Sequence, residues 1–120
     1  MNADVSMMER VLQNLVVNAV AYTRVGGRVV VWLERVGDEL VLRISNEGEV
    51  LGEDILDWFN GVEGVRPKKA AIGLSIVKRV LELHGFVFGA EVRDVVRGDE
   101  GGAGAPGGVN VFWFRMSVVR

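Results

Sequence analysis

The most informative stretch of this chain is Glu9-Arg-Val-Leu-Gln-Asn-Leu-Val-Val-Asn-Ala-Val-Ala-Tyr-Thr23. It indicates a helix in which Asn14, Asn18 and Tyr22 recur every four residues. Four residues turn a helix by about 400° and advance it by roughly 6 Å, so the three side chains share one stripe. Apolar residues occupy the positions around them at helical spacing: Met8, Val11, Leu12, Leu15, Val16 and Ala19.

Two asparagines beside the apolar side of a helix indicate that a polar group, from the protein or from a ligand, contacts their amides. An unpaired buried amide costs about 1–3 kcal/mol. Amide oxygens suit a metal ion with attached phosphates, and an aromatic ring one turn later suits a nucleobase. The alternative is that Asn14 and Asn18 lie at the edge of the apolar stripe and face water. The helix alone does not separate these two interpretations.

The composition describes a globular domain. With 120 residues, 49% of them hydrophobic and 25% charged, the chain is long enough for one core and too short for two. A net charge of −2 gives no electrostatic case for nucleic acid or for an anionic membrane. There is no cysteine, so disulfides and thiolate metal sites are excluded. No apolar run approaches the roughly 20 residues that span a bilayer, and the first residues do not show the n-region and h-region pattern of a signal peptide. Because the chain starts almost directly at its first helix, we expect a fragment of a longer protein.

Periodicity and turn residues predict the order of the elements. Two glycine-containing turns, at Gly26-Gly27 and Gly37-Asp38, separate the first helix from a β-hairpin. The predicted elements are helix 4–22, strands 28–35 and 39–45, loop 46–52, helix 53–59, an irregular segment 60–71, helix 72–83, and strands 86–96 and 109–119. We interpret the glycine-rich segment 98–108 as a hairpin linker rather than a phosphate loop, because no helix follows it and it contains no lysine. This order predicts an α/β (α+β) two-layer sandwich: a mixed, mostly antiparallel sheet with about three helices on one face.

The segment from Ala71 to Gly85 places Gly73 where the later helix begins. Free backbone N–H groups and the positive end of the helix dipole make such a helix start a natural anion site. A glycine there allows a phosphate to approach the backbone closely.

Taken together, these segments resemble the ATP-binding catalytic domain of sensor histidine kinases, which has the Bergerat fold shared with gyrase-like and chaperone ATPases. Residues 9–23 resemble its N box and residues 71–85 its second glycine box. Residues 45–50 occupy the place of the first glycine box, and residues 55–59 that of the phenylalanine box. The resemblance covers nearly all of residues 1–120, in the family's order, and implies one ATP-binding domain.

The resemblance implies roles for individual residues. Asn18 would coordinate Mg²⁺ and Asn14 would support the phosphates of ATP, while Tyr22 would lie against the adenine. Asn46 and Gly48 belong to the first glycine box. In the second box, the residues from Ile72 through Gly73 and Leu74 to Ser75 would bring backbone N–H groups to the phosphates. Residues 60–71 would form a short ATP lid, with three possible phosphate contacts: Arg66, Lys68 and Lys69.

The chain departs from the family pattern at several positions. Asn46 stands where the family usually has an aspartate that accepts a hydrogen bond from the adenine amino group, and an uncharged acceptor makes a bond roughly half as strong. Val50 lies near the place of a second glycine, and Ala70-Ala71 stands where Gly-x-Gly is common. These changes favour an alternative, a degenerate regulatory or binding module of the same fold.

The resemblance also bears on the reaction. The hydrolysing relatives carry a glutamate general base where this chain has Asn14, which cannot accept a proton at neutral pH. We therefore expect phosphoryl transfer to a histidine on a separate dimerisation domain, with a response regulator downstream. The single histidine, His84, matches a different family position and is interpreted as structural. A further alternative is an anti-sigma-type serine kinase. The resemblance implies a domain in the cytoplasm, which could be the cytoplasmic part of a membrane-bound sensor. We expect no nucleic-acid partner and no direct contact of this domain with the membrane.

Overall fold

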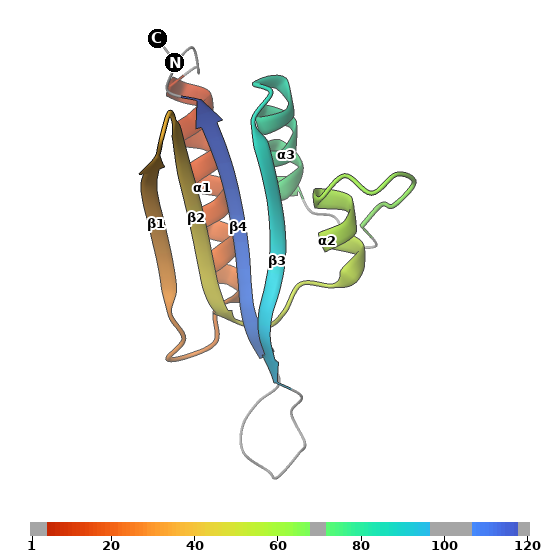
Figure 1. Ribbon diagram of the computed structural model, residues 1–120. Helices are drawn as coiled ribbons and strands as arrows, with labels where there is room; N and C mark the ends of the chain where they lie inside the picture. Colours follow the sequence, from red (N-terminus) through yellow and green to blue (C-terminus); the bar gives the residue numbers. More distant parts are fainter. Residues whose placement is uncertain (1–4, 68–71, 97–106, 118–120) are drawn as a thin grey trace.

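A computed structural model describes residues 5–67, 72–96 and 107–117, which form a sheet covered on one face by helices (Figure 1). The elements are α1 (Val5–Tyr22), β1 (Val29–Val36), β2 (Glu39–Gly48), α2 (Glu53–Phe59), α3 (Ile72–Leu83), β3 (Val87–Val96) and β4 (Gly107–Ser117). The strands lie in the order β1-β2-β4-β3. The predicted α/β sandwich is confirmed, although each pairing among the described strands is antiparallel rather than mixed.

Helix α1 is attached to the sheet by a narrow row of side chains. Val11, Leu15 and Ala19, spaced four residues apart, are at most 3% exposed. The sequence analysis predicted a broader apolar face that included Leu12 and Val16. This prediction was wrong, because Leu12 is 38% exposed and Val16 is 40% exposed. A single i, i+4 row suffices because a helix meets a flat sheet along one line. Among the described helices, none combines the length and apolarity that crossing a membrane requires.

The core lies between the helices and the sheet. Leu74, Val77 and Leu81 of α3 are buried there. From the sheet come Leu42, Ile44, Ala90, Phe112 and Phe114. Phe59, the last residue of α2, packs its ring edge-on against Phe88 and Phe112, with centroids 5.2 and 5.1 Å apart. Burial of these aromatic rings holds the short α2 against the rest of the domain, since each aromatic buries a large apolar area.

Strand β2 is longer than the sequence predicts. Residues 46–52 were predicted as a loop, but Asn46, Glu47 and Gly48 continue the strand. Asn46 lies opposite Val29 of β1 and opposite Asn110 of β4. The prediction was wrong because Asn, Glu and Gly are typical of loops, whereas strands on both sides satisfy the backbone here. Strand β4 also begins at Gly107, inside the segment predicted as a linker.

Strand β1 lies at the edge of the sheet and carries apolar side chains on both faces. Val31 is 56% exposed, Trp32 is 52% exposed and Leu33 is 60% exposed. Trp32 is thus a sheet-face residue, not a core residue. In the described part of the chain, β1 extends the sheet without adding to the core.

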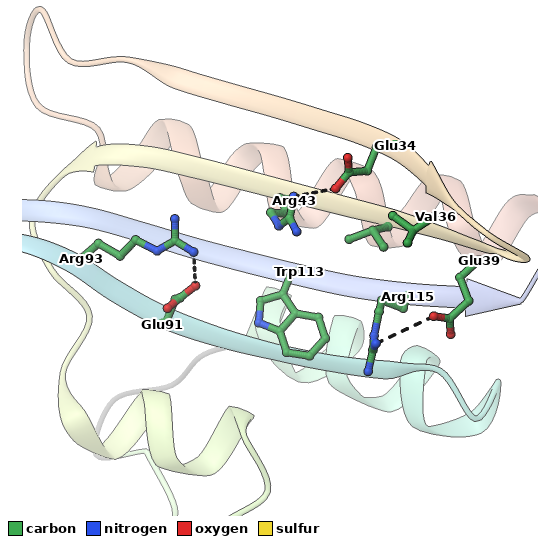
Figure 2. A pocket seen from close by; sticks show the side chains of 9 residues that line it. Glu34, Val36, Glu39, Arg43, Glu91, Arg93, Trp113 and Arg115 are labelled. Atoms are coloured by element: carbon green, nitrogen blue, oxygen red, sulfur yellow. Dashed lines mark hydrogen bonds and ion pairs between the residues drawn. The ribbon is translucent and has the colours of Figure 1, made fainter.

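The face of the sheet away from the helices carries charges that pair with one another (Figure 2). The ion pairs are Arg43–Glu34 at 3.2 Å, Arg93–Glu91 at 2.5 Å and Arg115–Glu39 at 3.8 Å. They surround Trp113, whose ring lies 5.8 Å from the Arg115 guanidinium carbon, in a shallow hollow of about 400 Å³. Because each of these charges already has a partner, this hollow offers little to a charged ligand.

Candidate nucleotide site

Asn14 of α1 lies against Gly73 at the start of α3. The two helices pack side by side, and a Cβ at position 73 would lie 3.0 Å from Asn14 Oδ1. Asn14 Nδ2 donates a hydrogen bond to the carbonyl oxygen of Arg10 at 2.8 Å, which leaves Oδ1 turned toward Gly73. Two segments that are about sixty positions apart in the sequence are therefore neighbours, and only a glycine leaves this space open.

The first turn of α3 offers a row of backbone donors. The helix begins at Ile72, so the N–H groups of residues 72–75 have no partner within the helix. Leu74 anchors this turn, because its side chain is 3% exposed and belongs to the core, whereas Ser75 is exposed. The arrangement suits an anion, since the positive end of the helix dipole lies at the same place.

The end of α1 is joined to the end of β2 by backbone hydrogen bonds. Glu49 N donates to the Tyr22 carbonyl oxygen at 3.2 Å, and Arg24 N donates to the Glu47 carbonyl oxygen at 3.0 Å. Thr23 and Gly48 form a β-bridge between them. These bonds fix the half-buried Tyr22 beside the segment that follows β2.

Asn18 and Asn46 each carry a buried amide nitrogen without a hydrogen-bond partner. Helix α1 and strand β2 run in the same direction (Figure 1), and the Thr23–Gly48 bridge aligns their ends. Asn18 precedes Thr23 by five residues of helix, and Asn46 precedes Gly48 by two residues of strand. At the usual rise per residue, each asparagine therefore lies about 7 Å from the bridge along its own element. The two amides therefore lie at the same level between α1 and the sheet. An unpartnered buried N–H costs about 1–3 kcal/mol, which a ligand carrying acceptors would recover.

Asn110 organises the same region and was missed by the sequence analysis. It is 1% exposed; its Oδ1 accepts a hydrogen bond from Leu51 N at 2.9 Å, and its Nδ2 donates to the Glu49 carbonyl oxygen at 2.7 Å. These two bonds hold the segment after β2 against the sheet. A signal was present in the sequence, since Asn110 precedes Phe112 and Phe114 with period two, which puts an amide on the core face of a strand.

A hollow of about 220 Å³ opens beside Tyr22. Its other lining residues come from the segment after β2 and from α2: Glu49, Val50, Leu51, Gly52, Asp54 and Ile55. The volume lies below the roughly 300–1,000 Å³ of pockets that enclose a whole small ligand. It is sufficient for part of a nucleotide, such as a base, with the remainder outside.

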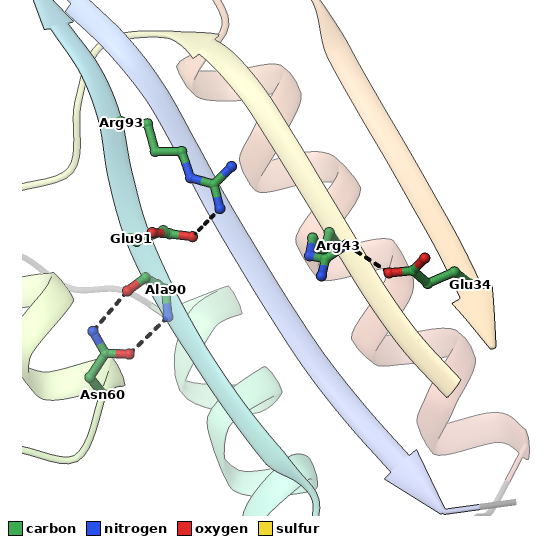
Figure 3. Close-up of polar contacts among 6 residues, drawn as sticks. All are labelled: Glu34, Arg43, Asn60, Ala90, Glu91 and Arg93. Atoms are coloured by element: carbon green, nitrogen blue, oxygen red, sulfur yellow. Dashed lines mark hydrogen bonds and ion pairs between the residues drawn. The ribbon is translucent and has the colours of Figure 1, made fainter. Parts of the chain in front are cut away.

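The segment after α2 contains neither helix nor strand over residues 60–67. Asn60 ties its beginning to β3: its Nδ2 donates to the Ala90 carbonyl oxygen at 2.9 Å, and its Oδ1 accepts from Ala90 N at 2.8 Å (Figure 3). Arg66 is exposed. Lys68 and Lys69, like Ala70 and Ala71, lie outside the described residues.

The described residues hold no cluster of three acidic, histidine or cysteine side chains that could bind a metal ion. A cation here would therefore depend on amide oxygens such as that of Asn18 and on oxygens of its own ligand, in keeping with the preference of Mg²⁺ for oxygen.

Comparison with known proteins agrees with this arrangement. The family model described as "Histidine kinase-, DNA gyrase B-, and HSP90-like ATPase" matches residues 3–119. The heme sensor protein HssS of Staphylococcus aureus (strain JH9) is 29% identical over 82 residues, which are 65% of this chain and 18% of HssS. The chain thus spans about a fifth of the length of the curated relatives it matches.

Solved structures show the same fold. The catalytic domain of histidine kinase ThkA superposes with a TM-score of 0.70 at 26% identity, covering 96% of this chain and 68% of that one. Full-length ShkA in complex with AMPPNP has a TM-score of 0.65 at 21% identity, covering 93% of this chain and 21% of that one. With a family model matched over nearly its whole length, the chain belongs to the family of histidine kinase-, DNA gyrase B- and HSP90-like ATPases.

Proposed function

We propose that this chain is the ATP-binding catalytic domain of a two-component sensor histidine kinase, which binds Mg-ATP and passes its γ-phosphate to a histidine on a separate dimerisation domain. The observation that carries the proposal is the pair of unpartnered amide nitrogens of Asn18 and Asn46, buried at one level beside the hollow-lining Tyr22. The family membership supports it, as does ShkA, a structure of this fold solved with AMPPNP.

The residues present fit Mg-ATP. Asn18 would offer its Oδ1 to Mg²⁺, and Asn14 would support the phosphates beside the N–H groups of residues 72–75. Tyr22 would lie against the adenine, and Arg66, Lys68 and Lys69 would reach the phosphates from the lid. When bound, Mg-ATP supplies the transferable phosphoryl group and the cation that neutralises its charge.

The protein's own contribution to catalysis would then be positioning and charge stabilisation. Asn14 cannot act as general base toward water, so transfer to another group is favoured over hydrolysis. Backbone N–H groups at the start of α3 are oriented before the phosphates arrive and need no reorganisation. The acceptor would lie elsewhere, because His84, the single histidine, has its Nδ1 2.8 Å from the Val80 carbonyl oxygen at the end of α3.

The partners follow from this proposal. A histidine-bearing dimerisation domain, in the same or a partner chain, would supply the phosphoacceptor, and a response regulator would receive the phosphate. The domain would work in the cytoplasm, where ATP is available.

Two observations favour a second function, that of a regulatory module with weak or no nucleotide binding. Asn46 lacks the negative charge that the family's aspartate places there, and the Tyr22 hollow is small. A serine kinase of the same superfamily would need a protein partner in place of the dimerisation domain.

Calorimetric titration with AMPPNP, with and without Mg²⁺, tests the proposal. We expect magnesium-dependent binding that Asn18→Ala abolishes and that the matched Gln13→Ala, at an exposed position of the same helix, leaves intact. The melting temperature of Asn18→Ala should not fall, because the substitution removes an unpaired amide. No binding of AMPPNP into the millimolar range would overturn the kinase proposal and support the regulatory module.

A further inference from the structure

Strand β1 leaves one side of its backbone open at the edge of the sheet. It is the first strand in the order β1-β2-β4-β3, so among the described strands it pairs with β2 alone. That pairing runs over Val29–Val36 without a shift in register, and the strand contains no proline. Bulges and prolines are the devices that usually prevent an edge strand from pairing with another chain. This edge is therefore a continuous template for a further strand.

The backbone groups of the odd-numbered residues of β1 point outward from this edge. Just before the strand, the Arg28 carbonyl oxygen accepts a hydrogen bond from Glu47 N of β2 at 2.9 Å. Because orientation alternates along an antiparallel strand, the N–H and C=O groups of Val29, Val31 and Leu33 point away from β2. A further strand would pair with these groups without breaking any bond between β1 and β2.

The side chains along this edge are apolar and exposed on both faces of the sheet. Val31 lies opposite Ile44 and Leu33 opposite Leu42, so both are on the face that carries the core. They are nevertheless 56% and 60% exposed, and Trp32 on the other face is 52% exposed. A strand placed along β1 would remove part of this apolar surface from water.

Residues 28–34 are complementary to a second copy of themselves. Their sequence is Arg-Val-Val-Val-Trp-Leu-Glu, with opposite charges at its two ends. In an antiparallel pair centred on Val31, each apolar residue lies opposite an apolar residue, and Arg28 lies opposite Glu34 at both ends. Moving the centre to Trp32 would place Glu34 opposite Val30, and moving it to Val30 would place Arg28 opposite Trp32. Only the register centred on Val31 therefore matches apolar to apolar and charge to opposite charge.

The two charged residues are available for such a pair. Arg28 is exposed, and the Glu34 side chain is 37% exposed. Glu34 also lies 3.2 Å from Arg43 of its own chain, but a carboxylate has two oxygens and can accept from both arginines. The contact within the chain therefore does not prevent one between chains.

We propose that β1 is an interface between two copies of this chain, which pair their edges antiparallel about a two-fold axis at Val31. Val31 would exchange backbone hydrogen bonds with its own copy, and Val29 with Leu33 of the second copy. The two sheets would continue as one, and the same patch would serve on both sides, as a two-fold axis requires. In the proposed histidine kinase, this interface would join two catalytic domains directly, in addition to the separate dimerisation domain.

Sedimentation equilibrium of the chain in solution tests this proposal. One pair of strands makes a small interface, so we expect a dimer with a dissociation constant of about 10–100 μM. Val31→Lys would place like charges opposite each other at the axis and should weaken the dimer by about tenfold or more. Val36→Lys makes the same change in β1 at a matching exposure of 54%, outside residues 28–34, and should leave the dissociation constant within about twofold.

A mixing experiment tests the register. Arg28→Glu alone, or Glu34→Arg alone, would place like charges opposite each other at both ends, so each should weaken its own dimer by about tenfold or more. An equimolar mixture of the two variants restores opposite charges at both ends and should dimerise with nearly the affinity of the natural chain.

Three results would overturn the proposal. The first is a natural chain that stays monomeric at about 1 mM, and this result does not depend on any variant. The second is a folded Val31→Lys, checked by circular dichroism, that dimerises as tightly as the natural chain. The third is a mixture of Arg28→Glu and Glu34→Arg that dimerises no better than either variant alone.

Discussion

The carbonyl oxygen of Tyr22 occupies the space that a side chain at position 48 would need, since a Cβ there would overlap that oxygen. Gly48 is buried, and the Thr23–Gly48 bridge holds the end of α1 against the end of β2. This contact between two backbones holds Tyr22 beside the segment that follows β2, and it makes position 48 a structural requirement of the site.

Gly48→Ala should therefore destabilise the domain severely. The overlap is with backbone held by two hydrogen bonds, so we expect a loss of at least about 3 kcal/mol in the free energy of unfolding, measured by urea denaturation. Gly52→Ala is the matched control, because the nearest atom to a Cβ there is the carboxylate oxygen of Asp54, at 2.7 Å on a side chain that can move. A change within about 1 kcal/mol is expected for the control. Equal effects of the two substitutions would contradict the assigned role of Gly48.

Asn110→Ala should loosen the segment that follows β2. It removes hydrogen bonds of 2.9 and 2.7 Å to the backbone of Leu51 and Glu49, and leaves the N–H of the buried Leu51 without this partner. We expect a loss of about 2–4 kcal/mol in the free energy of unfolding. Amide hydrogen exchange should accelerate at Leu51.

Asn60→Ala provides the comparison, because Asn60 also makes two hydrogen bonds, both to Ala90, from an exposed position (Figure 3). Water can replace those bonds, so the loss should be about 1 kcal/mol. If Asn60→Ala lowers the free energy of unfolding more than Asn110→Ala does, the two hydrogen bonds of Asn110 do not have the importance assigned to them.

Gly73→Ala should separate nucleotide affinity from stability. Alanine favours a helix by about 1 kcal/mol relative to glycine, so the melting temperature should stay level or rise. The added Cβ would lie 3.0 Å from Asn14 Oδ1 and fill the space that the phosphates would use. We expect the affinity for AMPPNP to fall about tenfold in calorimetry.

Ser75→Ala is the control for that measurement. The hydroxyl is exposed, and the proposed contact uses the backbone N–H, which alanine keeps. Affinity should stay within about twofold. A large loss with Ser75→Ala would show that the side chain, not the helix start, binds the ligand.

Lys78→Ala should weaken the contact between α3 and its neighbours. Lys78 Nζ lies 5.8 Å from the ring centre of Trp58 in α2 and 5.4 Å from that of Phe88 in β3. Loss of both cation–π contacts and of the packing of the aliphatic stem should cost about 1–2 kcal/mol in thermal or urea unfolding.

Glu82→Gln removes the ion pair of Lys78, a 3.3 Å contact to a carboxylate whose side chain is 51% exposed. It should change stability by less than about 0.5 kcal/mol. If Glu82→Gln lowers the free energy of unfolding more than Lys78→Ala does, the ion pair rather than the aromatic rings holds Lys78.

Periodicity predicted much of the fold correctly. The bounds of α2 and α3 match the sequence analysis, because Glu53 and Asp54 begin one helix and Gly85 follows the other. The strands of the β1–β2 hairpin were also identified from their alternating residues, within three positions at each end. These are local signals, carried by residues close together in the chain.

The errors fall where contacts are long-range. Asn46 was placed in a loop by its residue type and proved to be a strand residue paired on both sides. Leu12 and Val16 belonged to the predicted apolar face and proved to be exposed. Residue type cannot decide such positions, because the deciding partner lies in another part of the sequence.

Local patterns in the chain predicted the order and kind of the elements, and the spaced asparagines and glycines indicated a resemblance to the family that the comparison then showed. The contact of Asn14 with Gly73, the lack of room for a side chain at position 48, and the unpartnered buried amide nitrogens of Asn18 and Asn46 became known from the folded arrangement alone. The physical reason is that helix and strand propensities act over a few residues, whereas burial and the loss of hydrogen-bond partners exist only after distant segments have packed together.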